Sequence, residues 1–521
     1  MSLAEVRPIA PVQRIGSISP RVAYVAATVV MAALIVAGFA LSIATWTPAA
    51  VIALLLVAIT AGWISGGAMT ATLGLMSEPA HASRVPDDWS PSEKTAILVT
   101  LCGEDPKPLA RHLKALRRAL NTVGLGQTTQ IFVLSDTSGG TKIAAEETAF
   151  EDLRVDGTLL YRRRLINAGR KPGNIADWLS KHGADFSYML VLDADSRMSP
   201  QRIRNLIWQI ASRPGLGLLQ AGISLVPGTT RFGRYQRVAA RLLSRNFGRG
   251  FAAWTGDSGN YWGHNAIMRT AAFKEAASLP NLSGPAPFGG IVLSHDFIEA
   301  AWMRRAGWSI SLDPDTSGSA EEAPQSVSEF HRRDRRWCQG NLQHIRLLFE
   351  PGLCLISRMH LVSGIVSYLA APIWLTLIVL IATGAVPVNG SAALLLVLIA
   401  LLLPKLCAMA DWLGRARTKR RRLVALRALS AELVLSSVIA PLVMVRHTMS
   451  VLSICLGRDC GWKSPRLPQM RVPDGLPEAV VGVALLTLVW ATNASATLWL
   501  TPVLIPLCAA PLIVRALDAP V

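Results

Sequence analysis

Long apolar runs at both ends of the chain constrain its fold more than any other feature. Residues 22–45 and 49–75 contain no Lys, Arg, Asp or Glu, and each run is long enough to cross the roughly 30 Å hydrocarbon core of a bilayer. A second group occupies the C-terminal third, at residues 361–385, 391–409, 431–456, 479–498 and 500–514. With 51% hydrophobic residues, the chain is predicted to be a multi-pass membrane protein rather than an ordinary soluble enzyme.

The N-terminal runs are predicted to form a membrane anchor of two helices within residues 1–90. The first run is too long for the apolar part of a signal peptide, and the second follows almost at once. Arg7, Arg14 and Arg21 precede the first run, whereas the turn 46–48 is uncharged, so the positive-inside rule places the central segment in the cytoplasm. The net charge of +18 is interpreted as topology and attraction to membrane lipid, and no nucleic-acid partner is expected.

Basic residues flank the apolar run 431–456 on both sides. A cluster within 415–427 precedes the run, and more basic residues within 458–471 follow it. If both flanks are cytoplasmic, the run does not cross the membrane once. Pro441 could then divide it into a re-entrant or interfacial pair of helices. The C-terminal transmembrane bundle, residues 350–521, would bring the total to six crossings, against seven for a simple crossing, and both counts stay open.

The central segment, residues 91–349, has ordinary polarity and alternates between strand and helix patterns. Residues 96–101 and 131–134 are strand-like, and the leucines of 108–120 recur at helical spacing. Such alternation predicts an α/β domain with a mostly parallel sheet and helices on both faces. The seven cysteines form no CxxC pair, so free thiols are expected.

Two carboxylates follow the third predicted strand, residues 188–192. Asp193 and Asp195 are two residues apart, a spacing that points both side chains the same way in an extended chain. The carboxyl end of a strand is where open α/β sheets bind ligands, and oxygen donors so placed can hold Mg²⁺ or Mn²⁺ against a diphosphate. The competing interpretation is a solvated turn, because Asp-x-Asp is a short motif.

Three further segments could carry chemistry. Asp136 follows the second predicted strand and either hydrogen-bonds a nucleoside or makes an Asx turn. The turn 169–174 opens a helix, and its backbone N–H groups together with Lys171 suit a diphosphate as well as they suit a surface turn. Asp296 begins a helix and is either an N-cap or a general base that takes a proton from an acceptor hydroxyl, a role that His295 could also fill.

Arginines cluster at two places in the central segment. Those at residues 162–164 are interpreted as a solvated or lipid-facing group. The segment 332–341 is a stronger signal, because Arg333 and Arg336 can clamp phosphate oxygens while Trp337 offers a flat apolar face to a sugar ring. A basic amphipathic helix on the membrane is the alternative, and both interpretations can hold because an apolar run follows directly.

The order of these motifs resembles the processive membrane synthases of glycosyltransferase family 2. In those enzymes a cytoplasmic GT-A domain carries the pattern D, DxD, TED and QxxRW. The corresponding residues here are Asp136, Asp193-x-Asp195, Ser294-His295-Asp296 and Arg333-x-x-Arg336-Trp337. Ser-His-Asp thus replaces Thr-Glu-Asp, and Arg333 replaces the usual Gln. The strings GRKPGNIADW, YMLVLDADSRM and RRDRRWCQGNLQHIRLL, within residues 90–470, resemble the subfamily that makes osmoregulated periplasmic glucans.

The resemblance implies an α/β GT-A-type glycosyltransferase domain embedded between the α-helical transmembrane clusters of a bacterial inner-membrane protein. It implies an inverting, processive glucosyltransferase that uses UDP-glucose and Mg²⁺ or Mn²⁺ to extend a linear β-1,2-glucan, with translocation of the growing chain. A periplasmic glucan-processing partner is implied by the family alone. Two alternatives stay open: another family 2 synthase, such as one that makes cellulose, and a non-catalytic transporter or scaffold.

The resemblance also implies roles for single residues. Asp296 would be the catalytic base. The donor nucleotide would be bound by Asp136, Lys171, Asp193, Asp195, Arg333 and Arg336, of which Asp193 and Asp195 would hold the metal. The acceptor would be bound by Tyr261, Trp262, His264 and Trp337.

Overall fold

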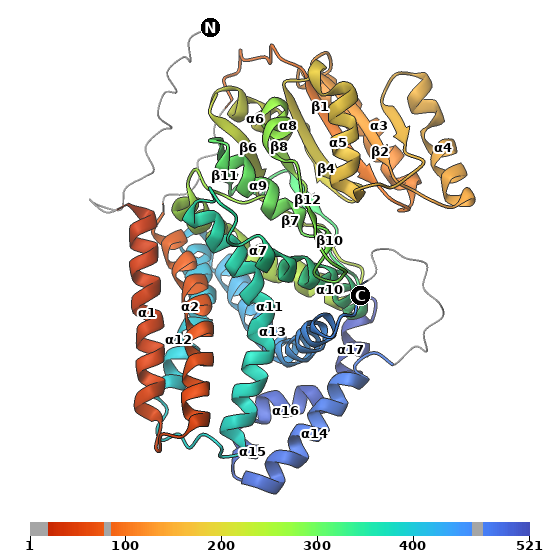
Figure 1. Cartoon of the computed structure of the whole chain (residues 1–521). Helices are drawn as coiled ribbons and strands as arrows, with labels where there is room; N and C mark the ends of the chain where they lie inside the picture. The colour runs from red at the N-terminus through yellow and green to blue at the C-terminus, as the bar shows by residue number, and fades with distance from the viewer. Residues whose placement is uncertain (1–18, 78–84, 461–472) are drawn as a thin grey trace.

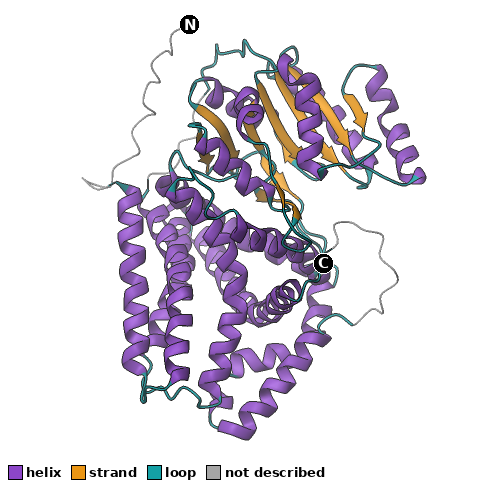
Figure 2. Cartoon of the chain, viewed as in Figure 1, coloured by secondary structure: helices purple, strands orange, loops and turns teal. Residues whose placement is uncertain are grey.

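The computed structural model describes residues 19–77, 85–460 and 473–521. An α/β domain stands at one end of a group of long apolar helices, and strands are confined to that domain (Figures 1 and 2). The chain begins with α1 (Pro20–Ser42) and α2 (Pro48–Met76), and Thr47 caps α2 by accepting a hydrogen bond from the backbone N–H of Ala50. Arg7 and Arg14, used above for orientation, lie outside the described residues.

The central sheet has seven strands in the order β11-β6-β8-β4-β1-β2-β3. Only β8 runs antiparallel to its neighbours β4 and β6, so the predicted mostly parallel sheet is confirmed. In chain order the strands are β1 (Thr95–Leu101), β2 (Thr129–Ser135), β3 (Leu160–Arg163), β4 (Tyr188–Asp193), β6 (Leu216–Ala221), β8 (Ala266–Arg269) and β11 (Ser309–Asp313).

Helices cover both faces of this sheet because its inner strands are apolar on both sides. Within β1, Ile97 and Val99 belong to one buried cluster, whereas Ala96 and Leu98 belong to the other. The first cluster includes side chains of α3 (Pro106–Thr122), α4 (Gly140–Val155) and α6 (Pro200–Ala211). The second includes side chains of α5 (Arg170–His182), α8 (Thr270–Ala276) and α9 (His295–Arg305). The predicted α/β fold class is therefore confirmed.

Short elements complete the domain. A small sheet of order β5-β12-β7 joins β5 (Arg197–Met198), β12 (Ser319–Glu321) and β7 (Ser224–Leu225), and β9 (Asn281–Leu282) pairs with β10 (Gly290–Ile291). Two helices, α7 (Arg231–Thr255) and α10 (Val327–Gln343), lie between the large sheet and the apolar helices (Figure 1). They form the boundary at which the two parts of the molecule meet.

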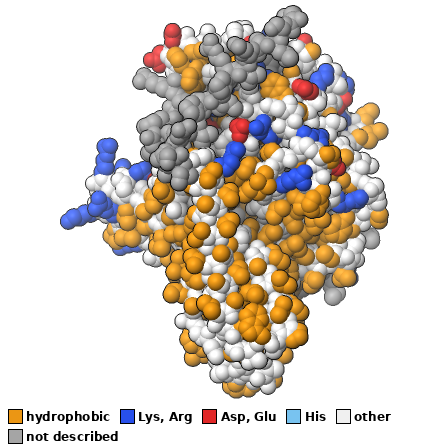
Figure 3. All heavy atoms as spheres, turned by 60° about the vertical axis from the view of Figure 1, so that its left-hand side comes forward, with side chains coloured by type: hydrophobic (Ala, Val, Ile, Leu, Met, Phe, Trp, Pro, Cys, Tyr) orange, Lys and Arg blue, Asp and Glu red, His pale blue; other side chains and the backbone are white. Residues whose placement is uncertain are grey.

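The regular elements among the described residues of the C-terminal part are all helices. It contains α11 (Leu355–Ala382), α12 (Ala392–Arg415), α13 (Lys419–Cys455), α14 (Leu476–Asn493), α15 (Ala496–Trp499), α16 (Thr501–Cys508) and α17 (Ala510–Asp518). By length and composition, α1, α2, α11, α12, α13 and α14 could each cross a membrane, and α16 with α17 could make a seventh crossing although they are bent by 69°. Apolar side chains dominate the surface of this part, with Lys and Arg along its upper edge (Figure 3).

The helix α13 differs from the prediction in one respect. Pro441 does not divide the segment, because α13 is one helix of 37 residues with Pro441 inside it. It is seen end-on in a view where α1, α2 and α11 run down the page, so it does not lie alongside them (Figure 1). We therefore propose that α13 lies along the membrane surface, which preserves the interfacial alternative without a break in the helix.

Candidate active site

Lys171 links the Asp-x-Asp motif at the end of β4 with helix α5 and with the loop around Gly263. Asp193 ends β4, and its side chain accepts a hydrogen bond from the hydroxyl of Thr100 on the adjacent strand β1 (3.0 Å). In the first turn of α5, Lys171 directs its Nζ to the carboxylate of Asp193 and donates a hydrogen bond to the backbone carbonyl of Gly263 (2.7 Å). The structure thus brings together two residues, Lys171 and Asp193, that the sequence placed 22 positions apart.

The two carboxylates of the motif have opposite electrostatic environments. Burial raises the pKa of Asp193, but the charge of Lys171 and other interactions outweigh burial and lower it overall. Burial, together with the negative charges of Asp193 and Glu321, raises the pKa of Asp195 to about 6. Lys171 pairs with Asp193, whereas the charges of His264 and Arg333 do not outweigh burial and the acidic neighbours of Asp195, so a divalent cation at this position would stabilise the ionised form of Asp195.

A metal at this position would need ligands from outside the protein. Within the described residues, no group of three or more His, Cys, Asp or Glu side chains is arranged to hold a metal ion. Two carboxylates fit a Mg²⁺ or Mn²⁺ that takes its other ligands from phosphate oxygens and water, since Mg²⁺ in particular is usually held this way. The residues present therefore fit a metal that arrives with a diphosphate.

Asp136 is held by an arginine at the same edge of the sheet. Arg164 follows β3, and its guanidinium makes two parallel hydrogen bonds to the Asp136 carboxylate, at 2.7 and 2.8 Å. The interpretation of residues 162–164 as solvated or lipid-facing is wrong for two of them. Besides Arg164, Arg162 pairs with Asp177 and hydrogen-bonds Asn174 on α5. The carboxyl ends of the parallel strands β2 and β3 meet at one edge, which explains why these side chains converge.

Glu146 organises the residues on both sides of Asp136 and was not anticipated from the sequence. This carboxylate on α4 is 1% exposed and accepts hydrogen bonds from the hydroxyls of Ser135 (2.6 Å), Thr137 and Tyr161 (3.0 Å). The Thr137 hydroxyl in turn accepts a hydrogen bond from the backbone N–H of Gly103 (2.7 Å). A buried acceptor shared by three donors therefore fixes the loop that carries Asp136.

Substituting Glu146 by Gln should destabilise the domain by about 1–3 kcal/mol, because the amide nitrogen would face hydroxyl donors in a buried site. The adjacent Glu147 is exposed on the same helix and provides a matched control. Thermal melting of the two purified variants tests this expectation. A drop in melting temperature for Glu146→Gln but not for Glu147→Gln is the expected result, and equal melting temperatures would contradict it.

Asp296 lies beside the backbone that Lys171 holds. It is the second residue of α9, and the position that a Cβ would take at Gly263 is only 3.5 Å from its Oδ2. Gly263 also has a φ of +86°, a conformation that favours glycine. Burial raises the pKa of Asp296, with the charge of His295 and backbone hydrogen bonds acting against that rise. Asp296 is thus a carboxylate of increased basicity that approaches the Asp193–Lys171 pair.

His295 faces a different partner. Its Nδ1 lies 2.9 Å from Oε2 of Glu299, one turn along α9, and Glu299 is 2% exposed. Burial lowers the pKa of His295, but the charge of Glu299 and the hydrogen bond between them outweigh burial and raise it overall. Because Nδ1 of His295 is engaged by Glu299, Asp296 is the better placed of the two candidate bases.

Glu321 connects the arginine–tryptophan segment to the Asp-x-Asp motif. Its Oε2 lies 3.1 Å from Nε2 of His264 and 3.8 Å from Nη2 of Arg333, and its charge contributes to the raised pKa of Asp195. On α10 the guanidinium carbon of Arg333 lies 4.5 Å from the centroid of the Trp337 ring, a cation–π contact. Glu321 therefore links Arg333 with Asp195, a role that no motif in the sequence indicates.

Other side chains of α10 fix this helix against its neighbours. Asp334 accepts a hydrogen bond from the Tyr368 hydroxyl (3.1 Å) and lies 2.6 Å from Nε2 of His447, and the Arg335 guanidinium donates to the Ser453 hydroxyl (2.9 Å). Arg336 is half-buried, and its charge acts on Cys460 just beyond the end of α13. Helix α10 thus carries the predicted Arg333–Trp337 clamp and also docks against α11 and α13.

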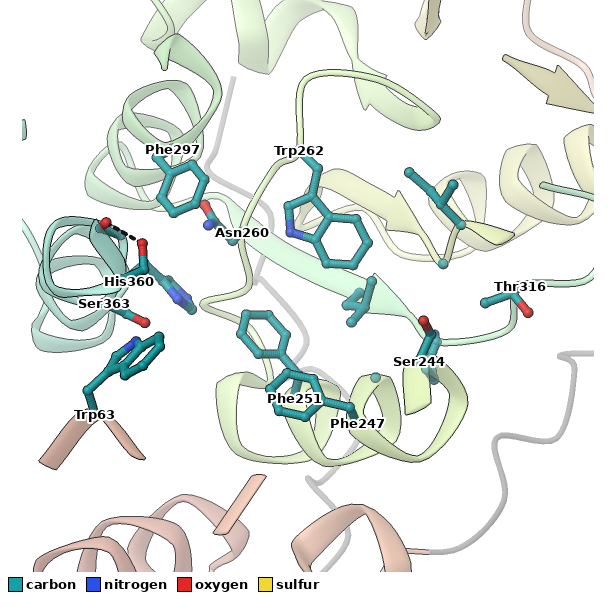
Figure 4. Close-up of a pocket in the computed structure, with 17 residues that line it drawn as sticks. Trp63, Ser244, Phe247, Phe251, Asn260, Trp262, Phe297, Thr316, His360 and Ser363 are labelled. Carbon is teal, nitrogen blue, oxygen red and sulfur yellow. Dashed lines mark hydrogen bonds between the residues drawn. The ribbon is translucent and has the colours of Figure 1, made fainter. Parts of the chain in front are cut away.

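The predicted acceptor residues do not share one role. Tyr261 is fully buried, belongs to the core, and donates its hydroxyl hydrogen bond to the carbonyl of Gly263 (2.7 Å). His264 is also buried and is engaged with Glu321. The expectation that both contact an acceptor is therefore wrong in this structure, because neither side chain is free to do so. They hold the backbone around Gly263 instead, whereas Trp262 points into a cavity (Figure 4).

The cavity has a volume of about 470 Å³ and lies where the α/β domain meets the apolar helices. Trp262 and Asn260 come from the loop before β8, Phe247 and Phe251 from α7, and Phe297 from α9 (Figure 4). Its remaining wall includes Trp63 of α2 and His360 and Ser363 of α11. Aromatic faces with a few polar groups suit a sugar ring. The predicted Trp337 is 44% exposed and does not line this cavity.

Several known proteins are similar to this chain in sequence. The family described as "Glycosyl transferase family group 2" matches residues 188–410. The chain is 40% identical over 463 residues to "Glucans biosynthesis glucosyltransferase H" of Vibrio cholerae serotype O1, covering 83% of this chain and 64% of that protein. It is 38% identical over 437 residues to the protein of the same name from Cereibacter sphaeroides, covering 78% and 73%. The chain therefore spans about two thirds of the length of these relatives.

Among solved structures, a mannosyltransferase from Pyrobaculum calidifontis in complex with GDP-Man and Mn²⁺ matches with a TM-score of 0.43 and 16% identity. The match covers 74% of this chain and 98% of that one. This likeness is too low to transfer ligands from that enzyme to the present chain.

Proposed function

The chain belongs to the glucans biosynthesis glucosyltransferase H family, and on this premise we propose that it is an inverting, processive glucosyltransferase that uses UDP-glucose to extend a linear β-1,2-glucan. One observation carries the catalytic part of the proposal. Lys171 contacts both Asp193 and the carbonyl of Gly263, and Asp296 abuts that same glycine. A carboxylate that would bind the nucleotide, a cation and a carboxylate of raised pKa therefore lie close together, an arrangement that supports glycosyl transfer. The donor sugar and the linkage rest on the family alone.

The donor would lie along the carboxyl edge of β1, β2 and β4. Asp136, oriented by Arg164, would hydrogen-bond the uridine, while Asp193 and Asp195 would face the diphosphate. A bound Mg²⁺ or Mn²⁺ would supply Lewis-acid stabilisation of the departing diphosphate. Lys171, Arg333 and Arg336 would neutralise the remaining charge on the leaving group. Since burial and the negative charges of Asp193 and Glu321 raise the pKa of Asp195, a cationic partner at this site is favourable.

Asp296 would act on the acceptor. Its raised pKa makes it a stronger proton acceptor than an ordinary aspartate, and burial shields the proton transfer from bulk water. It would take the proton of the acceptor hydroxyl while that oxygen attacks the anomeric carbon opposite the departing UDP. A single displacement of this kind inverts an α-linked donor into a β-linked product.

The cavity between the two parts of the molecule would bind the growing glucan. Its aromatic walls come from the domain, and Trp63, His360 and Ser363 come from helices that could cross the membrane. We propose that the product passes from this cavity between α2, α7 and α11 toward the far side of the membrane. In sealed vesicles with UDP-glucose added outside, glucan should accumulate inside. Product found only outside would refute translocation without affecting the proposed reaction.

The reaction is tested with the purified full chain, UDP-glucose and Mg²⁺. UDP release and a polymer with β-1,2 linkages are expected. Release of UDP with a different linkage would favour another family 2 synthase, such as one that makes cellulose. An absence of UDP release and of polymer under conditions where the chain stays folded would favour the transporter or scaffold alternative.

Substituting Trp262 by Ala should shorten the product and weaken acceptor binding by up to about tenfold, since an aromatic contact is worth roughly 0.5–1.5 kcal/mol. Trp499 is 80% exposed on α15 and offers a matched control. Product lengths from Trp262→Ala and Trp499→Ala, compared at equal UDP release, give the measurement. A normal length distribution for Trp262→Ala would argue against the cavity as the acceptor site.

A further inference from the structure

The first turns of α13 concentrate positive charge without acidic partners. No Asp or Glu occurs between Asp411 and Glu432 in the sequence. The exposed basic residues of this stretch are Arg417, Lys419, Arg420, Arg421, Arg422 and Arg427. Among the described contacts none of them forms a salt bridge, and Arg422 Nε donates a hydrogen bond to the backbone carbonyl of Ala416 (3.2 Å). Within residues 19–77, 85–460 and 473–521, the charge of this segment is therefore not neutralised by acidic side chains.

The same turns also expose apolar side chains. Leu423, Val424 and Leu426 are 49%, 59% and 46% exposed, and they lie between the basic run 419–422 and Arg427. Only the buried side chains of Ala425 and Leu429 pack inward, where they meet Met409 of α12. An exposed helix of this composition needs a partner that offers negative charge and hydrocarbon at the same time.

We propose that residues 417–427 form a binding site for anionic phospholipid. Acidic proteins and nucleic acids would satisfy the guanidinium groups but would leave Leu423, Val424 and Leu426 in water. A phospholipid satisfies both, because its phosphate and its acyl chains lie a few ångströms apart at the bilayer surface. Lys and Arg side chains of the molecule stand at the upper edge of the apolar surface, at the level where headgroups would lie (Figure 3).

The placement of α13 gives the site a structural consequence. The helix is continuous, and its other end docks against α10 through His447 and Ser453. A lipid bound at residues 417–427 would hold the N-terminal end of the same helix that supports the Arg333–Trp337 segment. A bound lipid would therefore help to hold α10, and with it the Arg333–Trp337 segment, in place from outside the active site.

The test uses the full chain in mild detergent micelles, titrated with phosphatidylglycerol or phosphatidylcholine and observed by native mass spectrometry. The variant replaces Lys419, Arg420, Arg421 and Arg427 by Gln. The matched control replaces four exposed basic residues of α3 by Gln, namely Lys107, Arg111, Lys114 and Arg118. Each basic residue near an anionic surface changes affinity by roughly fivefold, so the α13 variant should lose tenfold or more in phosphatidylglycerol affinity.

Four results would overturn the proposal. The first is an equal loss of phosphatidylglycerol in the α13 variant and the α3 control, which would indicate a bulk charge effect. The second is unchanged binding in the α13 variant. The third is complete displacement by inorganic phosphate at matched ionic strength, which would indicate an anion site rather than a lipid site. If the charge variant does not fold, Leu423→Asn with Val424→Asn retains every charge and should still weaken binding. Unchanged binding in that double variant would also overturn the proposal.

Discussion

Substituting Asp296 by Asn is expected to reduce glucosyl transfer by about 10²- to 10⁴-fold, the usual effect of removing a general base. Asn has nearly the same shape but cannot accept the acceptor proton. Asp296 does not itself bond Asp193 or Lys171 in the described contacts, so nucleotide binding should persist. UDP release measured beside binding of UDP to the same purified variant separates the two effects.

The control for this prediction is the neighbouring pair of His295 and Glu299. Replacing both residues by Gln removes the alternative base without leaving a single buried charge unpaired. This double variant should keep most of the activity of the unmodified protein, whereas Asp296→Asn should not. If the double variant were inactive while Asp296→Asn still transferred glucose at a normal rate, His295 would be the base and the proposed mechanism would be wrong.

Residues at the ends of regular strands were the most predictable parts of the site. Asp136 and Asp193 follow apolar strands, and parallel strands necessarily bring their carboxyl ends to one edge. Their convergence could be expected without knowing which helices cover the sheet. The segment at Arg333 was likewise recognisable from its composition and its helical spacing.

The partners of these residues could not be predicted, because each depends on packing between distant segments. Glu146 has ordinary exposed neighbours on α4, and only the approach of α4 to β2 and β3 turns it into a buried acceptor. Glu321 gains its role where β12 meets the loop around His264. Tyr261 was assigned to the acceptor site rather than to the core for a related reason. An irregular loop lacks the regular alternation that would show which side chains point inward.

The cavity wall and α13 show a second limit of what could be predicted from the sequence. The whole α/β domain lies between Trp63 and His360 in sequence, and hydropathy marks their helices as able to cross a membrane without indicating which faces meet the domain. For α13, Pro441 suggested a break. A proline inside a helix removes one hydrogen bond and introduces a steric clash, but packing against α11, α10 and α16 can offset that loss.

Substituting Asp195 by Asn should abolish most glucosyl transfer yet leave the ligand-free fold at least as stable as before. Activity should fall by about 10²- to 10⁴-fold, since a carboxylate that helps to hold a metal is worth several kcal/mol of charge stabilisation. Burial, Asp193 and Glu321 disfavour the ionised form of Asp195 in the folded protein, so removing its charge should stabilise the fold by an amount on the order of 1–3 kcal/mol.

Asp193 provides the matched comparison, two residues away on the same motif. Its carboxylate is paired with Lys171 and accepts the Thr100 hydrogen bond, so Asp193→Asn removes a favourable interaction and leaves the lysine without its partner. That variant should therefore be both inactive and less stable. Melting temperatures recorded in EDTA, next to UDP release in excess Mg²⁺, distinguish the two substitutions. Equal destabilisation of both variants would show that the charge of Asp195 does not disfavour the folded state. Retained activity of Asp195→Asn would show that Asp195 is not needed to hold the metal.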